Sequence, residues 1–160
     1  MDNPSTSVDD LLTSSDVRLL SDIGFVAACS SQRERAVQIF QALTLFRPLR
    51  AFPYLGLAVA NLNAKRSNEA ILALALGRRV LGTSPDRSTE AQEDFAMLGV
   101  FEGLAAHADG RRTEGLLLMN RAVTEAPVEG PAYRLGKRLL GLKEQEIGLS
   151  SGALNSLAEL

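Results

Sequence analysis

Residues 24–43, GFVAACSSQRERAVQIFQAL, and residues 58–77, AVANLNAKRSNEAILALALG, carry the same pattern of small and large apolar residues. Ala36 and Ala70 occupy the same place in the two stretches and stand 34 residues apart. Each alanine is followed four residues later by a large apolar residue. Small residues at such places let two antiparallel helices approach closely, and the large ones fill the space to the next pair. The pattern therefore predicts an all-α chain of stacked helix pairs.

A period of 34 residues is that of the tetratricopeptide repeat, a helix–turn–helix unit. The first copy covers residues 17–50 and the second covers residues 51–84. A weaker third copy is centred on residues 103–115, and its small residue, Gly115, lies 45 residues past Ala70. The difference of 45 − 34 = 11 residues indicates an insert.

The predicted domain organisation is simple. Residues 1–14, rich in Ser, Asp and Thr, are expected to be mobile. Residues 15–147 are expected to form a single tetratricopeptide-repeat domain with the insert near residues 83–93, and residues 148–160 a tail. A helix opened by Pro131 should cap the last pair by covering its apolar face. The predicted fold is an all-α tetratricopeptide-repeat helical array, with three helix pairs plus a C-terminal capping helix.

Residues that cap helices predict where the helices begin. Asp16 and Ser67 are expected as N-caps, and Ser31–Glu34 and Thr89–Gln92 have the form of a capping box. Pro53 is expected in a first helical turn, where its missing N–H costs nothing. The insert is interpreted as an exposed polar loop that leads into a lengthened helix and takes no part in the groove. The first helix is indicated by its apolar positions Val17, Leu20, Ile23, Gly24 and Ala27.

Composition narrows the possible functions. The chain has 160 residues, of which 46% are apolar and 22% charged, as in an ordinary globular domain. A formal charge of −2 provides no field to attract nucleic acid or an anionic membrane. The acidic N-terminus does not resemble a signal peptide, and no apolar stretch is long enough to span a membrane. We therefore expect a cytoplasmic protein that binds no nucleic acid and is not stably inserted in a membrane.

The sequence offers little that predicts catalysis. His107 is the only histidine and Cys29 the only cysteine, so neither a transition-metal site nor an intramolecular disulfide is expected. Cys29 is interpreted as a small core residue and His107 as a polar residue that faces the groove. No phosphate-binding glycine loop is present. We expect no catalytic residue, no metal and no cofactor, and predict that the protein is not an enzyme.

The first helices of stacked pairs line a concave groove, and the positions left free by packing face it. In the second and third copies almost all of these positions are apolar, which is typical of an interaction site. The alternative is that the insert or a terminus covers them. The predicted peptide-binding groove consists of Phe25, Phe52, Leu55, Val59, Leu62, Met97, Val100, Leu104 and His107.

Residues 40–57, FQALTLFRPLRAFPYLGL, followed by Glu69-Ala70-Ile71, resemble the junction between the first two repeats of the type III secretion translocator chaperones, the class II chaperones. The resemblance covers residues 16–80 well and residues 95–127 loosely. The chain departs from that family in its insert and in its short N-terminal segment, which in the family contributes to dimerisation.

This resemblance implies a cytoplasmic chaperone for a secreted hydrophobic translocator subunit, held as an extended segment in the groove before export, with a role in virulence. Asn61 and Asn63 are expected to bond the backbone of that segment. A homodimer is possible on this reading. The alternatives are a co-chaperone or adaptor for needle subunits of the same secretion system, and a self-assembling protein-interaction module.

Overall fold

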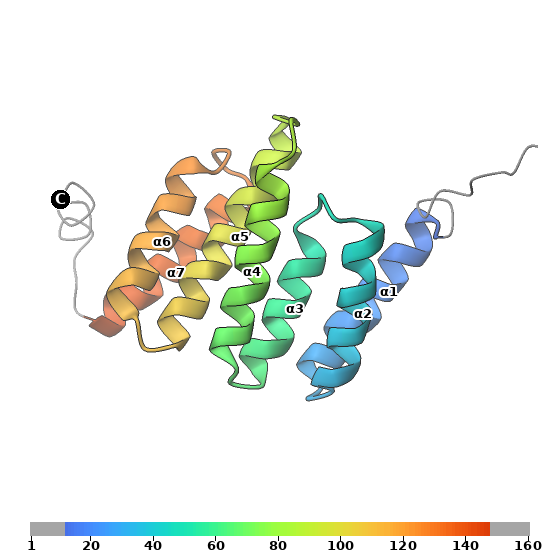
Figure 1. Ribbon diagram of the computed structural model, residues 1–160. Helices are drawn as coiled ribbons and strands as arrows, with labels where there is room; N and C mark the ends of the chain where they lie inside the picture. The colour runs from blue at the N-terminus through green and yellow to red at the C-terminus, as the bar shows by residue number, and fades with distance from the viewer. Residues whose placement is uncertain (1–11, 148–160) are drawn as a thin grey trace, which may run out of the picture.

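The computed structural model describes residues 12–147, with side chains described for residues 12–141. The described residues form seven α-helices and no strand, which confirms the all-α prediction (Figure 1). The helices are α1 (Ser14–Cys29), α2 (Arg33–Phe46), α3 (Phe52–Asn63), α4 (Ser67–Gly82), α5 (Thr89–Ala108), α6 (Arg112–Glu125) and α7 (Pro131–Ile147). The expectations for residues 1–11 and for the tail at 148–160 fall outside the described residues. None of the described helices is long and apolar enough to cross a membrane.

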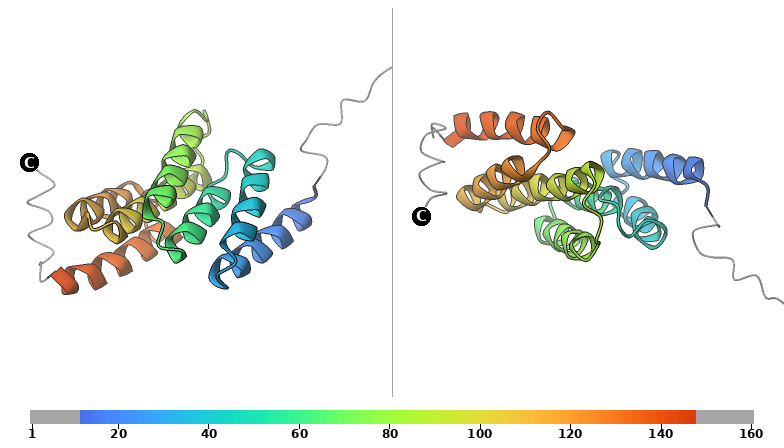
Figure 2. Two further views of the ribbon diagram at one scale, coloured as in Figure 1. Left: turned by 60° about the horizontal axis from the view of Figure 1, so that its bottom comes forward. Right: turned by 90° about the horizontal axis from the view of Figure 1, so that it is seen from above.

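The helices stack in chain order. Each helix packs against the next, and the odd-numbered helices also contact one another in sequence, α1 with α3, α3 with α5 and α5 with α7. Figure 2 shows the consequence from above: α1 and α7 lie on one side of the layer, whereas α2 and α4 lie on the other. The odd-numbered helices therefore share one face of the molecule.

One turn geometry recurs between the helices of each pair. Ser31, Lys65 and Gly110 all adopt a left-handed conformation, with φ of 61°, 58° and 86°. Their spacings, 34 and 45 residues, equal those that the sequence pattern predicts. The next residue in each turn donates its N–H to a carbonyl five residues back, which satisfies the end of the preceding helix. In all three pairs, the same turn thus joins the first helix to the second.

Small and large apolar residues occupy the predicted places in the core. Ala36 and Ala70 have no exposed surface, as predicted. Phe40, Leu74 and Met119, which stand four residues after the small residue of each copy, are also fully buried. At the third copy Gly115 packs directly against α5.

The helix starts correct several predictions. α1 begins three residues earlier than expected, because Thr13 is its N-cap and Asp16 is the third helical residue, whose side chain completes the capping box. The Asp16 carboxylate accepts hydrogen bonds from Thr13 N at 2.9 Å and Thr13 Oγ1 at 2.6 Å. These bonds hold the pKa of Asp16 below its ordinary value.

The predicted capping box at Ser31–Glu34 and the predicted cap at Ser67 are wrong. The N-caps of α2, α4 and α6 are Gln32, Arg66 and Arg111, and none of their side chains accepts a capping hydrogen bond. In each pair, the N-cap of the second helix is the residue that directly follows the left-handed residue of the turn. Pro53 does lie in the first turn of α3, as predicted.

The lengthened helix after the insert is confirmed, with a change of one residue at its start. α5 has 20 residues and follows an exposed loop. Ser88, and not Thr89, is its N-cap, accepting a hydrogen bond from Ala91 N at 3.2 Å. Asp86 in turn accepts hydrogen bonds from Ser88 N and Ser88 Oγ, which lower the pKa of Asp86.

Candidate functional site

The solvent-facing side of α3 is a stripe of four large apolar side chains, Phe52, Leu55, Val59 and Leu62. Apart from Leu55 and Val59, all residues from Pro53 to Asn61 are buried. The four are spaced at i, i+3, i+7 and i+10, so they lie on one narrow face of the helix. Phe52 and Val59 pack partly against the core of the first helix pair, whereas Leu55 and Leu62 pack against the core formed by α3, α4 and α5. We call these four residues the α3 stripe.

Phe25 on α1 lies beside this region. Its half-buried ring meets Phe40 edge to face, with ring centroids 4.8 Å apart. Three other apolar residues of α1 point to solvent: Leu19, Ile23 and Val26 are 59%, 40% and 65% exposed. Ile23, one of the apolar positions predicted for the first helix, is exposed because α1 is the first helix and no described helix covers that side.

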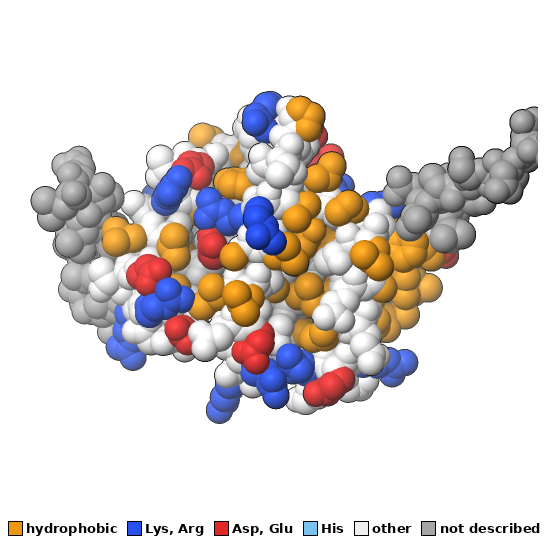
Figure 3. Space-filling model, viewed as in Figure 1, with side chains coloured by type: hydrophobic (Ala, Val, Ile, Leu, Met, Phe, Trp, Pro, Cys, Tyr) orange, Lys and Arg blue, Asp and Glu red, His pale blue; other side chains and the backbone are white. Residues whose placement is uncertain are grey.

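Apolar side chains are also exposed on the opposite face of the molecule. Figure 3 shows them gathered around α4 and α2 and toward α1. Leu45 on α2 and Leu72 on α4 are mostly exposed, at 73% and 69%. Apolar exposure is thus not confined to the predicted groove.

The part of the groove predicted on α5 is covered at one of its four positions. Val100 has no exposed surface, because it lies where α7 packs at Gly136. Met97 is half-buried against the cluster of Ala96, Ala126 and Ala132. The capping helix α7 therefore removes Val100 from the candidate surface and leaves Met97 at its edge.

Leu104 and His107 are half-buried on α5. A residue that the sequence pattern did not single out, Phe101, is also half-buried and packs against the same core as Leu55 and Leu62. Its counterparts in the other two copies are Gly56 and Asp22, so no repeat signal pointed to an apolar position there. The candidate surface consists of the α3 stripe with Phe25, Phe101 and Leu104 beside it.

The two asparagines expected to bond a peptide backbone are used inside the protein. Asn61 accepts a hydrogen bond from Arg33 Nε at 2.9 Å and donates one to the Leu57 carbonyl at 2.8 Å. Asn63 donates to the Ala28 carbonyl at 3.1 Å. These bonds fasten the end of α3 to α1 and α2, so the prediction for Asn61 and Asn63 is corrected to a structural role.

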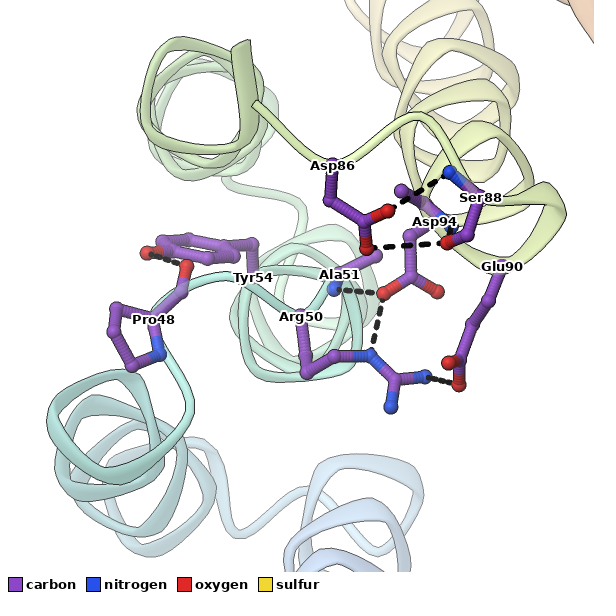
Figure 4. A network of polar contacts seen from close by, with 9 residues as sticks. Pro48, Arg50, Ala51, Tyr54, Asp86, Ser88, Glu90 and Asp94 are labelled. Atoms are coloured by element: carbon purple, nitrogen blue, oxygen red, sulfur yellow. Dashed lines mark hydrogen bonds and ion pairs between the residues drawn. The ribbon is translucent and has the colours of Figure 1, made fainter. Parts of the chain in front are cut away.

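The start of α3 is held by residues of the insert and of α5 (Figure 4). Asp94 accepts hydrogen bonds from Arg50 Nε at 2.8 Å and from Ala51 N at 2.9 Å. Glu90 pairs with the same guanidinium at 2.8 Å. The insert is therefore docked against the junction of the first two copies, a contact that the prediction of an exposed polar loop did not include.

Tyr54 lies on the other side of this junction. Its hydroxyl donates a hydrogen bond to the Pro48 carbonyl at 3.0 Å (Figure 4), and burial raises the pKa of the phenol. The ring is almost fully buried. Tyr54 thus ties the turn before α3 to the core.

Two further expectations concern chemistry. Cys29 is exposed at the end of α1, so its interpretation as a core residue was wrong. Among the described residues no group of three or more His, Cys, Asp or Glu side chains is placed to hold a metal ion.

Comparison of the chain with models of known protein families, with curated proteins and with solved structures finds no match in any of the three.

Proposed function

We propose that this protein is a chaperone of the tetratricopeptide-repeat type, which binds a hydrophobic segment of another protein on the face formed by its odd-numbered helices. Two features support the repeat assignment: the turn that recurs at spacings of 34 and 45 residues, and the contacts between successive odd-numbered helices. In this proposal the partner is a hydrophobic translocator subunit of a type III secretion system, bound in the cytoplasm before export. That identity depends on the resemblance of residues 40–57 to the class II chaperones.

The α3 stripe is the observation that carries the proposal. A central helix of a globular protein usually presents polar residues where it reaches solvent. Here the side of α3 that reaches solvent is apolar along its length, and Phe101 and Leu104 extend the surface onto α5. Such a surface suits an apolar partner segment, whose burial is favourable by about 25 cal/mol per Å² of apolar area.

Co-expression with hydrophobic secreted proteins from neighbouring genes tests the proposal. The expected result is a stable complex that co-purifies with the chain. Leu55→Asn combined with Val59→Thr should abolish the complex, because both changes put polar groups into the α3 stripe without enlarging a side chain. Leu72→Asn, on an exposed leucine of α4, is the matched control and should retain it.

Circular dichroism and thermal melts of the variants separate lost binding from lost folding. If the Leu55→Asn/Val59→Thr variant folds and still forms the complex, the α3 stripe is not the binding surface. If no hydrophobic secreted partner co-purifies with the wild-type chain, the chaperone proposal is wrong.

A second candidate, a self-assembling module, is favoured by the exposed row on α1. Leu19, Ile23 and Val26 lie at i, i+4 and i+7, which suits packing against another helix. A second copy of the chain would bury this row in a symmetric contact. In this case Val26→Glu should convert an oligomer to a monomer in light scattering, whereas Leu45→Glu on α2 should not. A chain that is monomeric without either change would refute this candidate.

A further inference from the structure

The insert forms one wall of a pocket of about 500 Å³ that lies away from the α3 stripe. The pocket is bounded by the turn before α3, the end of α4, and the first turns of α5. No residue of the α3 stripe lines it. Its volume falls in the range of sites that hold small molecules or the side chains of a peptide.

The lining combines apolar residues with an excess of negative charge. Leu49, Leu81 and Phe95 supply apolar surface, and Leu49 is 50% exposed. Arg78 already covers one face of the Phe95 ring, at 4.8 Å from its centroid. The ionisable lining residues are four carboxylates and two guanidinium groups: Asp86, Glu90, Asp94, Glu125, Arg50 and Arg87.

Both arginines are engaged by the protein itself. Arg50 is paired with Asp94 and Glu90, at 2.8 Å in each case. Arg87 donates hydrogen bonds to the backbone carbonyls of Ser84 at 2.8 Å and Asp86 at 3.1 Å. The lining therefore has a formal charge of −2, from four carboxylates and two guanidinium groups. Arg121, which lies outside the lining, pairs with Glu125 at 2.8 Å, so a charge of −2 + 1 = −1 is left to favour a cationic ligand over an anionic one.

The acidic side chains are held in place. Asp86 is fixed by two hydrogen bonds from Ser88, and Asp94 by Arg50 and the backbone of Ala51. A preformed site loses less conformational entropy when a ligand binds. The pocket thus presents fixed negative charge beside apolar surface.

We propose that this pocket is a second binding site, for a peptide segment of a partner protein in which a lysine or arginine adjoins a large apolar side chain. The apolar side chain packs on Leu49, Leu81 and Phe95. The cationic group lies against the carboxylate of Asp86 and shares that of Glu90 with Arg50. This site goes beyond the proposed function, and its test needs neither a natural cargo nor the α3 stripe.

The test uses two capped tripeptides as probes, acetyl-Leu-Lys-Leu-amide and acetyl-Leu-Glu-Leu-amide. Each is titrated into the ¹⁵N-labelled full chain at low salt, and amide shifts are followed by NMR. The lysine peptide should shift the amides of residues 84–95 and of Arg50 in a saturable way, and the glutamate peptide should not. The affinity should fall as salt is raised, because added ions screen the attraction between exposed charges, which decays over about 10 Å at 0.1 M ionic strength.

A pair of glycines provides matched variants. Gly82 lines the pocket, Gly141 lies on α7, and a Cβ added to either would meet no heavy atom within 4 Å. Neither has the left-handed backbone that disfavours a side chain. Gly82→Leu should therefore fill the pocket and abolish the shifts, whereas Gly141→Leu should leave them unchanged.

A charge variant tests the electrostatic part of the proposal. Glu90→Gln should weaken binding of the lysine peptide about two- to fivefold, as expected for one exposed charge. Three results would overturn the proposal: equal shifts from both peptides, absence of saturable shifts at residues 84–95, or shifts that persist in Gly82→Leu. Shifts confined to the α3 stripe would also overturn it, while leaving the proposed function intact.

Discussion

Gly103 and Gly115 allow α5 and α6 to touch backbone to backbone. A Cβ added to Gly103 would lie 2.6 Å from the Gly115 carbonyl oxygen, and one added to Gly115 would lie 2.6 Å from the Gly103 carbonyl oxygen. Real Cβ atoms do not approach an oxygen so closely, so one helix would have to move. At this contact a single methyl group decides how the third pair packs.

Gly115→Ala should lower the free energy of unfolding by about 1–3 kcal/mol, the usual cost of overpacking, despite the better helix propensity of alanine. Gly141→Ala is the matched control: its Cβ meets nothing, so it should raise stability by up to about 1 kcal/mol. Urea denaturation measures both. Equal effects of the two changes would show that α5 and α6 are not in contact at these glycines.

Asp16 should make the start of α1 sensitive to acid. Because hydrogen bonds from Thr13 lower the pKa of Asp16 in the folded protein, its contribution to stability is present above the ordinary carboxyl pKa. That contribution is lost as pH falls through the lowered value. Thr13→Ala should raise the pKa of Asp16 toward the ordinary value in an NMR titration, whereas Ser14→Ala should not. An unchanged titration in Thr13→Ala would contradict the capping box.

At the scale of secondary-structure elements, α7 depends on a residue from α5. Glu93 Oε1 accepts a hydrogen bond from the backbone N–H of Ala132, in the first turn of α7. Glu93 Oε2 is buried near Gly130 and forms no hydrogen bond with the described residues. A carboxylate at this place satisfies a free backbone donor and interacts favourably with the helix dipole. α5 thus fixes where α7 begins, and with it the covering of Val100.

Glu93→Ala should loosen α7 and lower the free energy of unfolding by about 0.5–2 kcal/mol, as for the loss of an N-cap. Hydrogen exchange should accelerate first in the amides of α7, because they lose their anchor. Glu34→Ala, whose side chain is 81% exposed, is the control and should have little effect. If exchange in α7 is unaltered by Glu93→Ala, this contact does not hold the helix.

At the scale of the whole molecule, the network around Arg50 joins parts of the chain that lie far apart in the sequence. Asp94 bonds Arg50 and Ala51 across 44 and 43 residues. The start of α3 and the first turns of α5 are therefore linked directly, in addition to their packing through α4. The insert contributes Glu90 to this link and forms the wall of the pocket.

Asp94→Ala should cost about 1–3 kcal/mol, because it leaves the Ala51 N–H without its partner. Arg50→Ala should cost less, since Asp94 keeps its bond to Ala51. A double-mutant cycle between the two measures the coupling, which should exceed that of the exposed Arg66–Glu69 pair. A coupling no larger than that of this pair would show that the network contributes little to stability.

Local pattern was enough to predict much of the fold. The 34-residue spacing and the positions of Ala36, Ala70 and Gly115 depend on residues close in sequence. Helix periodicity and steric demands at helix crossings act over such short separations. The four positions of the α3 stripe were obtained in the same way, from the phase of one helix.

The errors arose where a distant part of the chain intervened. Val100 was assigned to the groove from its phase in the repeat, but α7 covers it. Asn61 was expected to bond a peptide ligand, but its side-chain oxygen accepts a hydrogen bond from Arg33, 28 residues earlier in the chain. The insert was interpreted as an exposed polar loop leading into a lengthened helix, because nothing in the local sequence reveals that Glu90, and Asp94 just after the insert, pair with Arg50.

The sequence by itself determined that residues 12–147 are all-α, which segments form helices to within a few residues, and which small residues separate the paired helices. Those properties follow from periodicity and from the volume of single side chains. Only the tertiary structure decided how much of the apolar face stays open and where α7 and the insert dock. It also decided that a charged pocket forms between the insert, the turn before α3 and the end of α4. The reason is that burial and charge pairing depend on which distant segments meet. The periodicity of apolar residues along one helix does not tell which other segments pack against it.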